Sequence, residues 1–396
     1  MAEELVVELA QPFPEACVRE LEGTLVHLSP HIRSAKCTAD PPSVVLCLGG
    51  PPESDLKRRV ERLASRMAES CRRVEKKLID SFQGSGVFNR NPLPELLDRG
   101  WVRSHSPGAY SYSGPFFGVI EWLDSTLLNV ALQFQAQPFE FPSTLPLDAA
   151  LDAGYLLNHP HQAVPSAKLA RSPETFQALS RQLRLGNHHA VPEILAQAAA
   201  VDGLQAPAVC LNFWRSLKGK RKLPKNLLVG TAAGICQRNE DELEGLERLG
   251  QFRMREIFVI GEPGQVAGFS KRLSRLPAKL ARRWGLTGFV ETATDSFYLD
   301  RQAVMRIYQL NLGLKQELRL QLPFEEGRTL AAASLNFHRD YFAQAFAIGA
   351  DMPFRCHSCC LAFGLERLAF SLFAQHGMEV DRWPFRVSLP HGLSFS

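Results

Sequence analysis

A cluster of cysteines precedes the segment that is best suited to binding a phosphate. Residues 356–377 read CHSCCLAFGLERLAFSLFAQHG and lead from the cysteines through Gly364 into an apolar helix. Arg367 lies in the first turn of that helix. A buried guanidinium needs an anionic partner, which here is either a phosphate or a carboxylate such as that of Glu366. A phosphate would also gain from the free N–H groups of the helix N-terminus. The residues alone leave both interpretations open.

A second group of residues is suited to binding a purine nucleotide. Two strand-like runs, 227–237 and 252–261, flank an acidic loop, so Arg238, Phe252 and Arg253 should lie close together. A guanidinium can neutralise a phosphate with two hydrogen bonds, and a phenyl ring can stack on a purine. A solvated hairpin would explain the same residues without any ligand.

The common phosphate-binding loops are missing from the sequence. Lys218-Gly219-Lys220 lacks the upstream glycines of a P-loop. The glycines of residues 261–268 (GEPGQVAG) have the wrong spacing for a dinucleotide fingerprint, and we interpret this segment as a turn. Any nucleotide must therefore be bound by another kind of site.

The elements that would position these residues indicate an α+β fold. A basic helix is expected near 265–284 and a final helix over 364–375, and further extended runs cover 288–299, 315–322 and 329–337. These strands are separated by loops rather than by regular helices. We therefore expect a largely antiparallel sheet flanked by helices, and not a doubly wound parallel sheet.

The sequence also suggests a division into domains. Residues 1–82 are expected to form a small N-terminal α/β domain of unknown role, whose apolar positions predict a long helix within 53–82. Residues 83–94, rich in Gly, Ser, Asn and Pro, are the expected linker. The remaining residues, 95–396, would form the catalytic domain, with a helical insertion near 172–200.

The composition is that of an ordinary folded protein. Of the 396 residues, 45% are hydrophobic and 22% are charged, and no apolar run is long enough to span a bilayer. A net charge of +4 is too small to indicate nucleic-acid binding by itself. The N-terminus does not resemble a secretory signal and nine cysteines are an odd number, so we expect reduced thiols in the cytoplasm.

Together these segments resemble the catalytic core of class II aminoacyl-tRNA synthetases, over roughly residues 94–377. The resemblance is to the zinc-dependent atypical seryl-tRNA synthetases and to their truncated homologues, the amino acid:[carrier protein] ligases. Three motifs carry it, in the expected order: residues 140–142 (EFP), 236–261 and 364–367. Two further segments match, residues 334–338 (SLNFH) and 293–298 (ATDSFY), although Ser296 stands where the family has a proline.

The resemblance implies a zinc site made of two cysteines and one glutamate. Its ligands would be Cys210, Glu256 and Cys360, at spacings similar to those of the family. Cys359 competes for the third position because adjacent strand residues point to opposite faces, and the register to the third motif favours Cys360. Such a donor set suits Zn²⁺ and leaves a fourth position open. A structural zinc hook at Cys356-x-x-Cys359 is disfavoured because a second pair of ligands is lacking.

The resemblance further implies that the protein activates a small amino acid with ATP. The amino group would occupy the open zinc position, and the carboxylate would attack the α-phosphate of ATP and release pyrophosphate. Arg238 would hold the α-phosphate and Arg367 the γ-phosphate, with Mg²⁺ sharing the charge. The implied ATP-binding set is Arg238, Glu240, Phe252, Arg253 and Arg367, and the amino acid pocket would contain Ser334 and Asn336.

The acceptor of the activated amino acid separates three hypotheses. We favour transfer to the phosphopantetheine thiol of an acyl or peptidyl carrier protein, because residues 1–82 fit poorly to the two-helix arm of common seryl-tRNA synthetases. The alternatives are a seryl-tRNA synthetase-like enzyme that acylates tRNA and an inactive paralogue that binds or regulates. The family implies a homodimer. Basic stretches at 218–225 and 271–283 are either solvated surface or a face for an acidic partner.

Overall fold

One eight-stranded sheet organises the larger part of the chain. The structure is a computed structural model that describes residues 3–10, 13–14, 18–39, 41–73, 76–86, 88–240, 242–295, 309–310 and 312–388. In spatial order the strands are β4 (Leu78–Phe82), β13 (Gly288–Thr292), β14 (Lys315–Gln321), β15 (Thr329–Arg339), β16 (His357–Gly364), β12 (Gln251–Gly261), β11 (Leu227–Gln237) and β7 (Gln137–Pro138). Only the β7–β11 pair is parallel. The expected α+β class with a largely antiparallel sheet is confirmed.

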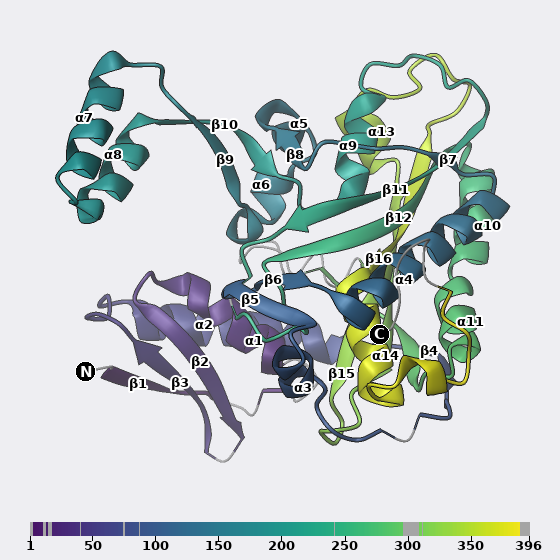
Figure 1. Cartoon of the computed structure of the whole chain (residues 1–396), viewed down its shortest axis with the longest axis horizontal. Helices are drawn as coiled ribbons and strands as arrows, with labels where there is room; N and C mark the ends of the chain where they lie inside the picture. The colour runs from purple at the N-terminus through teal and green to yellow at the C-terminus, as the bar shows by residue number, and fades with distance from the viewer. Residues whose placement is uncertain are drawn as a thin grey trace.

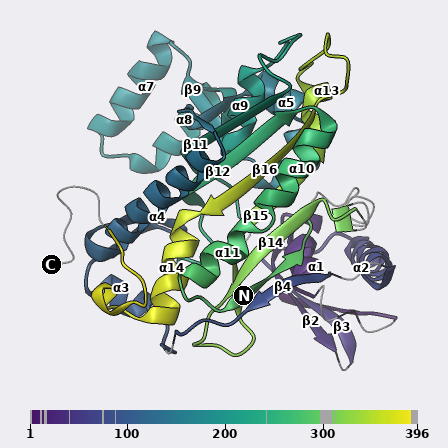
Figure 2. The same cartoon turned by 90° about the vertical axis from the view of Figure 1, so that its right-hand side faces the viewer.

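Long helices cover one face of this sheet and form the larger hydrophobic core. They are α4 (Gly114–Gln133), α10 (Pro263–Leu273), α11 (Leu276–Arg283) and α14 (Leu365–His376), and Figure 2 views the sheet from their side. The single basic helix expected at 265–284 is two helices, because the chain turns after Leu273 and Pro277 starts the first turn of α11.

Shorter elements cover the opposite face. They are α5 (Leu147–Asp152), α6 (Tyr155–Asn158), α9 (Val209–Ser216), α13 (Tyr341–Ala345) and β8 (Thr144–Pro146). Successive side chains of β12 point alternately into the two cores. Met254 and Phe258 pack on this second face. Ile257 and Val259 pack under the long helices. The sheet is therefore buried on both sides along its central strands.

The N-terminal part of the chain has a separate sheet and core. It contains β1 (Glu3–Glu8), α1 (Val18–Leu25), β2 (Ile32–Ala39), β3 (Pro42–Leu48) and α2 (Leu56–Arg73), with the antiparallel strand order β1-β3-β2. Its core includes Leu21, Leu46 and Val60, all fully buried. Figure 1 shows this unit in purple beside the main body.

The end of this unit differs from the sequence-based expectation. Helix α2 ends at Arg73, and Leu78–Phe82 is an edge strand of the main sheet, paired with β13. The spacing of apolar residues continued past the helix and could not reveal this long-range pairing. The expected linker is also packed: Gly84 donates its N–H to Thr287 Oγ1 at 2.9 Å. A Cβ at Gly84 would lie 1.8 Å from the Gly285 carbonyl oxygen.

A helical hairpin projects from the main body, as Figure 1 shows. Its helices α7 (Pro173–Arg184) and α8 (Val191–Ala198) stand on the paired strands β9 (Pro165–Leu169) and β10 (Ala199–Gln205). Ser172 caps α7 by accepting the Thr175 N–H at 3.3 Å. Neither helix contains a buried residue. The remaining regular elements include α3 (Leu93–Asp98), β5 (Val102–Ser106) and β6 (Ala109–Tyr112). None of the helices in the described ranges is long and apolar enough to cross a membrane.

Candidate functional site

Two thiols and a carboxylate meet on the sheet face that carries α9. Cys210 lies in the first turn of α9, Glu256 on β12 and Cys360 on β16, and one ligand atom from each lies within 4.8 Å of the other two. All three side chains are buried. Glu256 Oε1 accepts the N–H groups of Val209 at 2.8 Å and Cys210 at 3.2 Å. Glu256 Oε2 is buried and has no hydrogen-bond partner. An unpartnered buried carboxylate oxygen beside two thiols is a donor set that fits a divalent cation such as Zn²⁺.

The surroundings of this trio favour its neutral, protonated forms when no cation is bound. The hydrogen bond with Cys360, burial and the Glu256 carboxylate raise the pKa of Cys210 well above its ordinary value. The hydrogen bond from Cys210 favours the Cys360 thiolate, but burial outweighs it and raises the pKa of Cys360 to about 11. Burial raises the pKa of Glu256 as well. A divalent cation would reverse this preference because it stabilises all three anions directly.

The two adjacent cysteines of β16 face opposite sides of the sheet. Cys360 packs on the face of α9 and Cys210, whereas Cys359 packs in the core under the long helices. Burial raises the pKa of Cys359 to about 12, which is typical of an inert buried thiol. Cys356 also lies outside the trio, so within the described residues the geometry gives no support to a Cys356-x-x-Cys359 hook.

Arg238 and Phe252 lie next to each other at the ends of β11 and β12. Arg238 Cζ is 5.3 Å from the centre of the Phe252 ring, and its Nε donates to the Pro207 carbonyl at 2.9 Å. The backbone N–H of Arg238 donates to the Gly250 carbonyl, which closes the strand pair. The expected pairing of a cation with an aromatic face is therefore present.

Arg367 belongs to the same electrostatic environment. Burial lowers its pKa, and the positive charge of Arg238 lowers it further, whereas Glu240 acts in the opposite direction. Arg367 Nη1 donates to the Ala331 carbonyl at 3.1 Å. Across the described ranges, neither Arg238 nor Arg367 forms an ion pair with a carboxylate. Two half-buried guanidiniums without acidic partners are suited to binding an anion.

Arg253 does not join this group, although the sequence placed it there. Alternation along β12 directs its side chain to the opposite face from Phe252, where it forms ion pairs with Glu121 and, at 3.7 Å, with Asp124 of α4. Its role is thus to tie β12 to α4, and we remove it from the nucleotide-binding set. Glu240 remains beside the arginines and accepts Arg248 Nε at 3.1 Å.

Ser334 and Asn336 lie on β15 beside the trio. Asn336 is the cross-strand partner of Cys360 and donates to Ser334 Oγ at 3.0 Å. Both side chains are half-buried on the face that carries the trio. The other matching segment, 293–298, is described only as far as Asp295, whose carboxylate pairs with Lys315 Nζ at 2.6 Å. Residues 296–298 lie outside the described residues.

The sequence did not reveal two residues that belong to this neighbourhood. Tyr155 has a buried hydroxyl without a hydrogen-bond partner, and it interacts electrostatically with Arg238 and Glu240. His338 lies 3.7 Å from Cys360 through Nε2, and burial lowers its pKa to about 4. The alternation in SLNFH, which places Ser334, Asn336 and His338 on one face, was the available signal for His338.

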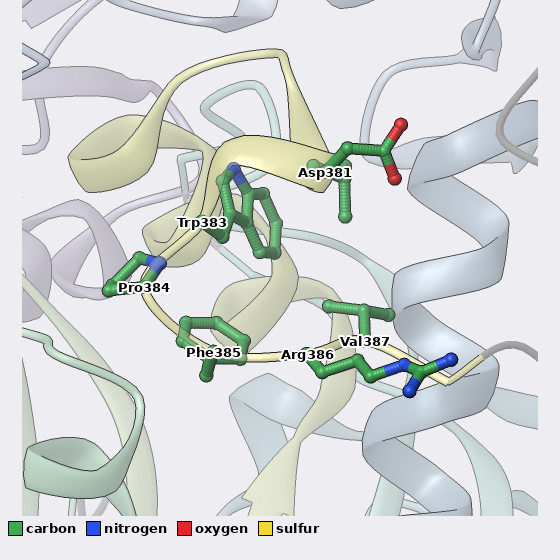
Figure 3. Close-up of a pocket in the computed structure, with 7 residues that line it drawn as sticks. Asp381, Trp383, Pro384, Phe385, Arg386 and Val387 are labelled. Atoms are coloured by element: carbon green, nitrogen blue, oxygen red, sulfur yellow. The ribbon is translucent and has the colours of Figure 1, made fainter.

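A hollow elsewhere in the molecule does not coincide with this site. Residues between Val380 and Val387, in the segment after α14, line a cavity of about 550 Å³. Figure 3 shows Trp383, Pro384 and Phe385 around it. None of the trio, the arginines or Phe252 lines it. The candidate site is therefore defined by its side chains and not by the size of a cavity.

Comparisons with known proteins relate the chain to two kinds of ligase. No family model matches the chain. The chain is 29% identical over 304 residues to amino acid–[acyl-carrier-protein] ligase 2 of Bradyrhizobium diazoefficiens. The matched residues make up 77% of this chain and 89% of that protein. It is 27% identical over 307 residues to the type-2 serine–tRNA ligase of Methanothermobacter thermautotrophicus. That match covers 75% of this chain but only 59% of the ligase.

Solved structures give the fold. The seryl-tRNA synthetase of Methanopyrus kandleri, solved with a tRNA, superposes with a TM-score of 0.71 at 22% identity, covering 96% of this chain and 76% of that one. The chain has the seryl-tRNA synthetase fold. A seryl-tRNA synthetase from Pyrococcus horikoshii, solved with ATP, matches with a TM-score of 0.57 at 11% identity, over 82% of this chain and 76% of that one. In this class II fold, Glu256 and Cys360 lie on the paired central strands β12 and β16, and Cys210 lies on α9. Arg238 follows the end of β11, and Arg367 lies in the first turn of α14.

Proposed function

We propose that this protein is an ATP-dependent ligase that activates a small amino acid as an aminoacyl-adenylate and passes it to the phosphopantetheine thiol of a carrier protein. The observation that carries the proposal is the coexistence of two features around one sheet: a buried Cys210–Glu256–Cys360 trio and two half-buried arginines without acidic partners. The first suits a metal that selects an amine, and the second suits a polyphosphate.

The trio would hold Zn²⁺ through two thiolates and the free oxygen of Glu256. When bound, such a metal supplies a Lewis-acid position that accepts an unprotonated α-amino group. Asn336 and Ser334 lie beside Cys360 and would line the pocket for the rest of the amino acid. A pocket with these polar groups at its wall favours a small substrate over a large apolar one.

The arginines would bind and orient ATP. Arg238 would neutralise the α-phosphate as the substrate carboxylate attacks it, and Arg367 would hold the γ-phosphate of the departing pyrophosphate. Phe252 would stack on adenine, and Glu240 would lie beside the nucleotide. We include Mg²⁺ between the phosphates because two guanidiniums do not balance the charge of ATP. No protein nucleophile is needed, since alignment and charge neutralisation lower the barrier.

We favour the carrier protein as acceptor because of the share of each relative's length that this chain matches. The chain spans 89% of the length of the two amino acid–[acyl-carrier-protein] ligases, against 58–73% of the type-2 serine–tRNA ligases. One observation favours tRNA instead: the Methanopyrus seryl-tRNA synthetase covers 96% of this chain, so its match includes most of the N-terminal unit. We therefore keep tRNA acylation as the second candidate function.

We also propose a homodimer, as in class II synthetases, and a cytoplasmic location. The short strand β7 is an edge of the main sheet, and Leu132 near the end of α4 is 46% exposed, which leaves an apolar edge for a second copy. The seven cysteines whose side chains the structure describes are free thiols, as expected in a reducing compartment.

Amino-acid-dependent ATP–pyrophosphate exchange tests the enzymatic proposal. The protein, with its zinc content assayed, is measured with each of the twenty amino acids, and exchange is expected with one or two small ones. A folded, zinc-loaded protein that exchanges with none would support the inactive paralogue. The acceptor is then tested with a pantetheinylated carrier protein, its apo form and total tRNA. Loading of tRNA that fades in moderate salt, with none on the carrier, would favour the second candidate.

A further inference from the structure

His338 lies beside the trio at an irregularity of strand β15. The pairing of β15 with β16 shifts between Phe337 and Arg339, and Arg339 has a positive φ of 54°. His338 is the extra residue of this bulge. Bulges often redirect a side chain beside an active site. Here the imidazole ends over Ser358 and Cys360, which lie on the same face of β16.

Both ring nitrogens of His338 have a specific neighbour. Nε2 lies 3.7 Å from Cys360 Sγ, and Nδ1 lies 3.3 Å from Ser358 Oγ. Trp214 and Phe342 pack against the ring edge-on, with centroids 5.9 Å and 4.7 Å away. The ring is therefore held by packing and by two polar contacts, which fixes its orientation.

The imidazole flanks the trio and does not complete it. The set of mutually close ligand atoms in the described residues contains Cys210, Glu256 and Cys360 but not His338. A fourth tetrahedral ligand would have to lie at a similar distance from the ligand atoms of Cys210, Glu256 and Cys360. Among the three ligand residues, His338 contacts Cys360, through Nε2 at 3.7 Å from Sγ.

We propose that His338 is a positioning residue for the metal site, which donates Nε2–H to the Cys360 thiolate while Ser358 Oγ–H donates to Nδ1. This rests on the proposed zinc site. A metal-bound thiolate carries no proton, so it can only accept a hydrogen bond, and the donor must be the imidazole. Ser358 fixes the required tautomer because its hydroxyl donates to the other nitrogen. The bond orients the sulfur and withdraws charge from it, and the fourth metal position stays free for the substrate amine.

The test measures the metal and not the activity, using the full-length protein. Zinc affinity is obtained by chelator competition, and the thiolate-to-metal charge-transfer band is recorded after substitution with Co²⁺. In His338→Phe we expect zinc affinity to fall about 10- to 100-fold and the Co²⁺ band to move to longer wavelength. His338→Gln, which keeps an N–H near Nε2, should recover most of both properties, and Ser358→Ala should show a smaller change in the same direction.

His357→Phe is the matched control, since His357 contacts Phe337 on the other face of the sheet and should leave zinc affinity and spectrum unchanged. His338→Phe with wild-type affinity and spectrum would overturn the role of His338 alone. A change of coordination number in that variant would overturn it in favour of direct ligation. Wild-type protein that binds no zinc would overturn the metal site itself. If His338→Phe does not fold, Ser358→Ala with an unchanged Co²⁺ band is the contradicting result.

Discussion

Phe252 and Glu256 project from the same face of β12, four residues apart. At about 3.4 Å per residue they are separated by about 14 Å along the strand. One rigid strand thus carries both the residue proposed to contact adenine and a proposed metal ligand. The distance between the two halves of the site is set by backbone geometry and does not depend on a loop.

Removing a member of the trio should abolish metal binding. In Cys210→Ser and Glu256→Gln, we expect zinc content to fall to near zero and amino-acid-dependent exchange to be lost with it. Metal analysis of purified protein checks this. Cys359→Ser is the control, because this equally buried thiol lies on the opposite face and should keep its zinc. Full zinc in Cys210→Ser would refute the assignment.

The three arginines should behave differently. Arg238→Met and Arg367→Met are expected to slow exchange about 10²- to 10³-fold, because each removes charge neutralisation in the transition state. Neither substitution should lower the melting temperature, because a half-buried guanidinium that lacks an acidic partner does not stabilise the folded state, so its removal costs no stability. Arg253→Met should retain the KM for ATP but lose about 1 kcal/mol of stability with its Glu121 ion pair. A higher KM for ATP in Arg253→Met would return this residue to the nucleotide site.

Zinc binding should release protons. The pKa values of the Cys210 and Cys360 thiols are raised, the latter to about 11, so both are protonated in the metal-free protein near neutral pH. We expect the logarithm of zinc affinity to rise with pH with a slope of roughly two. Calorimetry in buffers of different ionisation enthalpy measures this number. A slope near zero would exclude thiolate ligation.

Glu366 should make the protein less stable as the pH rises. Burial raises the pKa of its carboxyl group to about 7, against an ordinary value of 4.5. The neutral form is thus favoured in the folded state, and its contribution is complete below pH 4.5 and lost as the pH passes 7. Relative to Glu366→Gln, the wild type should lose up to about 3 kcal/mol over this window. Parallel urea-unfolding curves for the two proteins across pH 4.5–8 would contradict this.

The position of β4 predicts where the chain tolerates shortening. A chain beginning at Lys76 keeps β4 and should fold, because the N-terminal unit has a core of its own. A chain beginning at Gln83 exposes the edge of β13 and removes the buried Phe82, so it should melt at a lower temperature and aggregate. Light scattering and thermal melting compare the two. Equal stability would mean that β4 contributes nothing to the sheet.

The sequence was informative where local pattern and structure coincide. The strand-like runs predicted at 227–237 and 252–261 coincide with β11 and β12, except that β12 begins one residue earlier, at Gln251. The predicted start of the helical insertion near residue 172 coincides with Ser172, which caps α7. Contacts between distant segments could not be read in this way. The pairing of β4 with β13, the ion pairs of Arg253 with α4 and the bulge at His338 all depend on which strands become neighbours.

The adjacent cysteines Cys359 and Cys360 of β16 make the proposed metal site sensitive to strand register. A slip of one residue would exchange the faces of Cys359 and Cys360. The sulfur of Cys359 would then take the place of Cys360 beside Cys210 and Glu256. The same slip would turn Leu361 and Phe363 out of the core under the long helices, and would move Ser358 away from His338. Misassembled protein could thus retain a cysteine at the metal while losing the orientation of the site. Zinc content alone would then overstate the fraction of correctly folded molecules in a preparation.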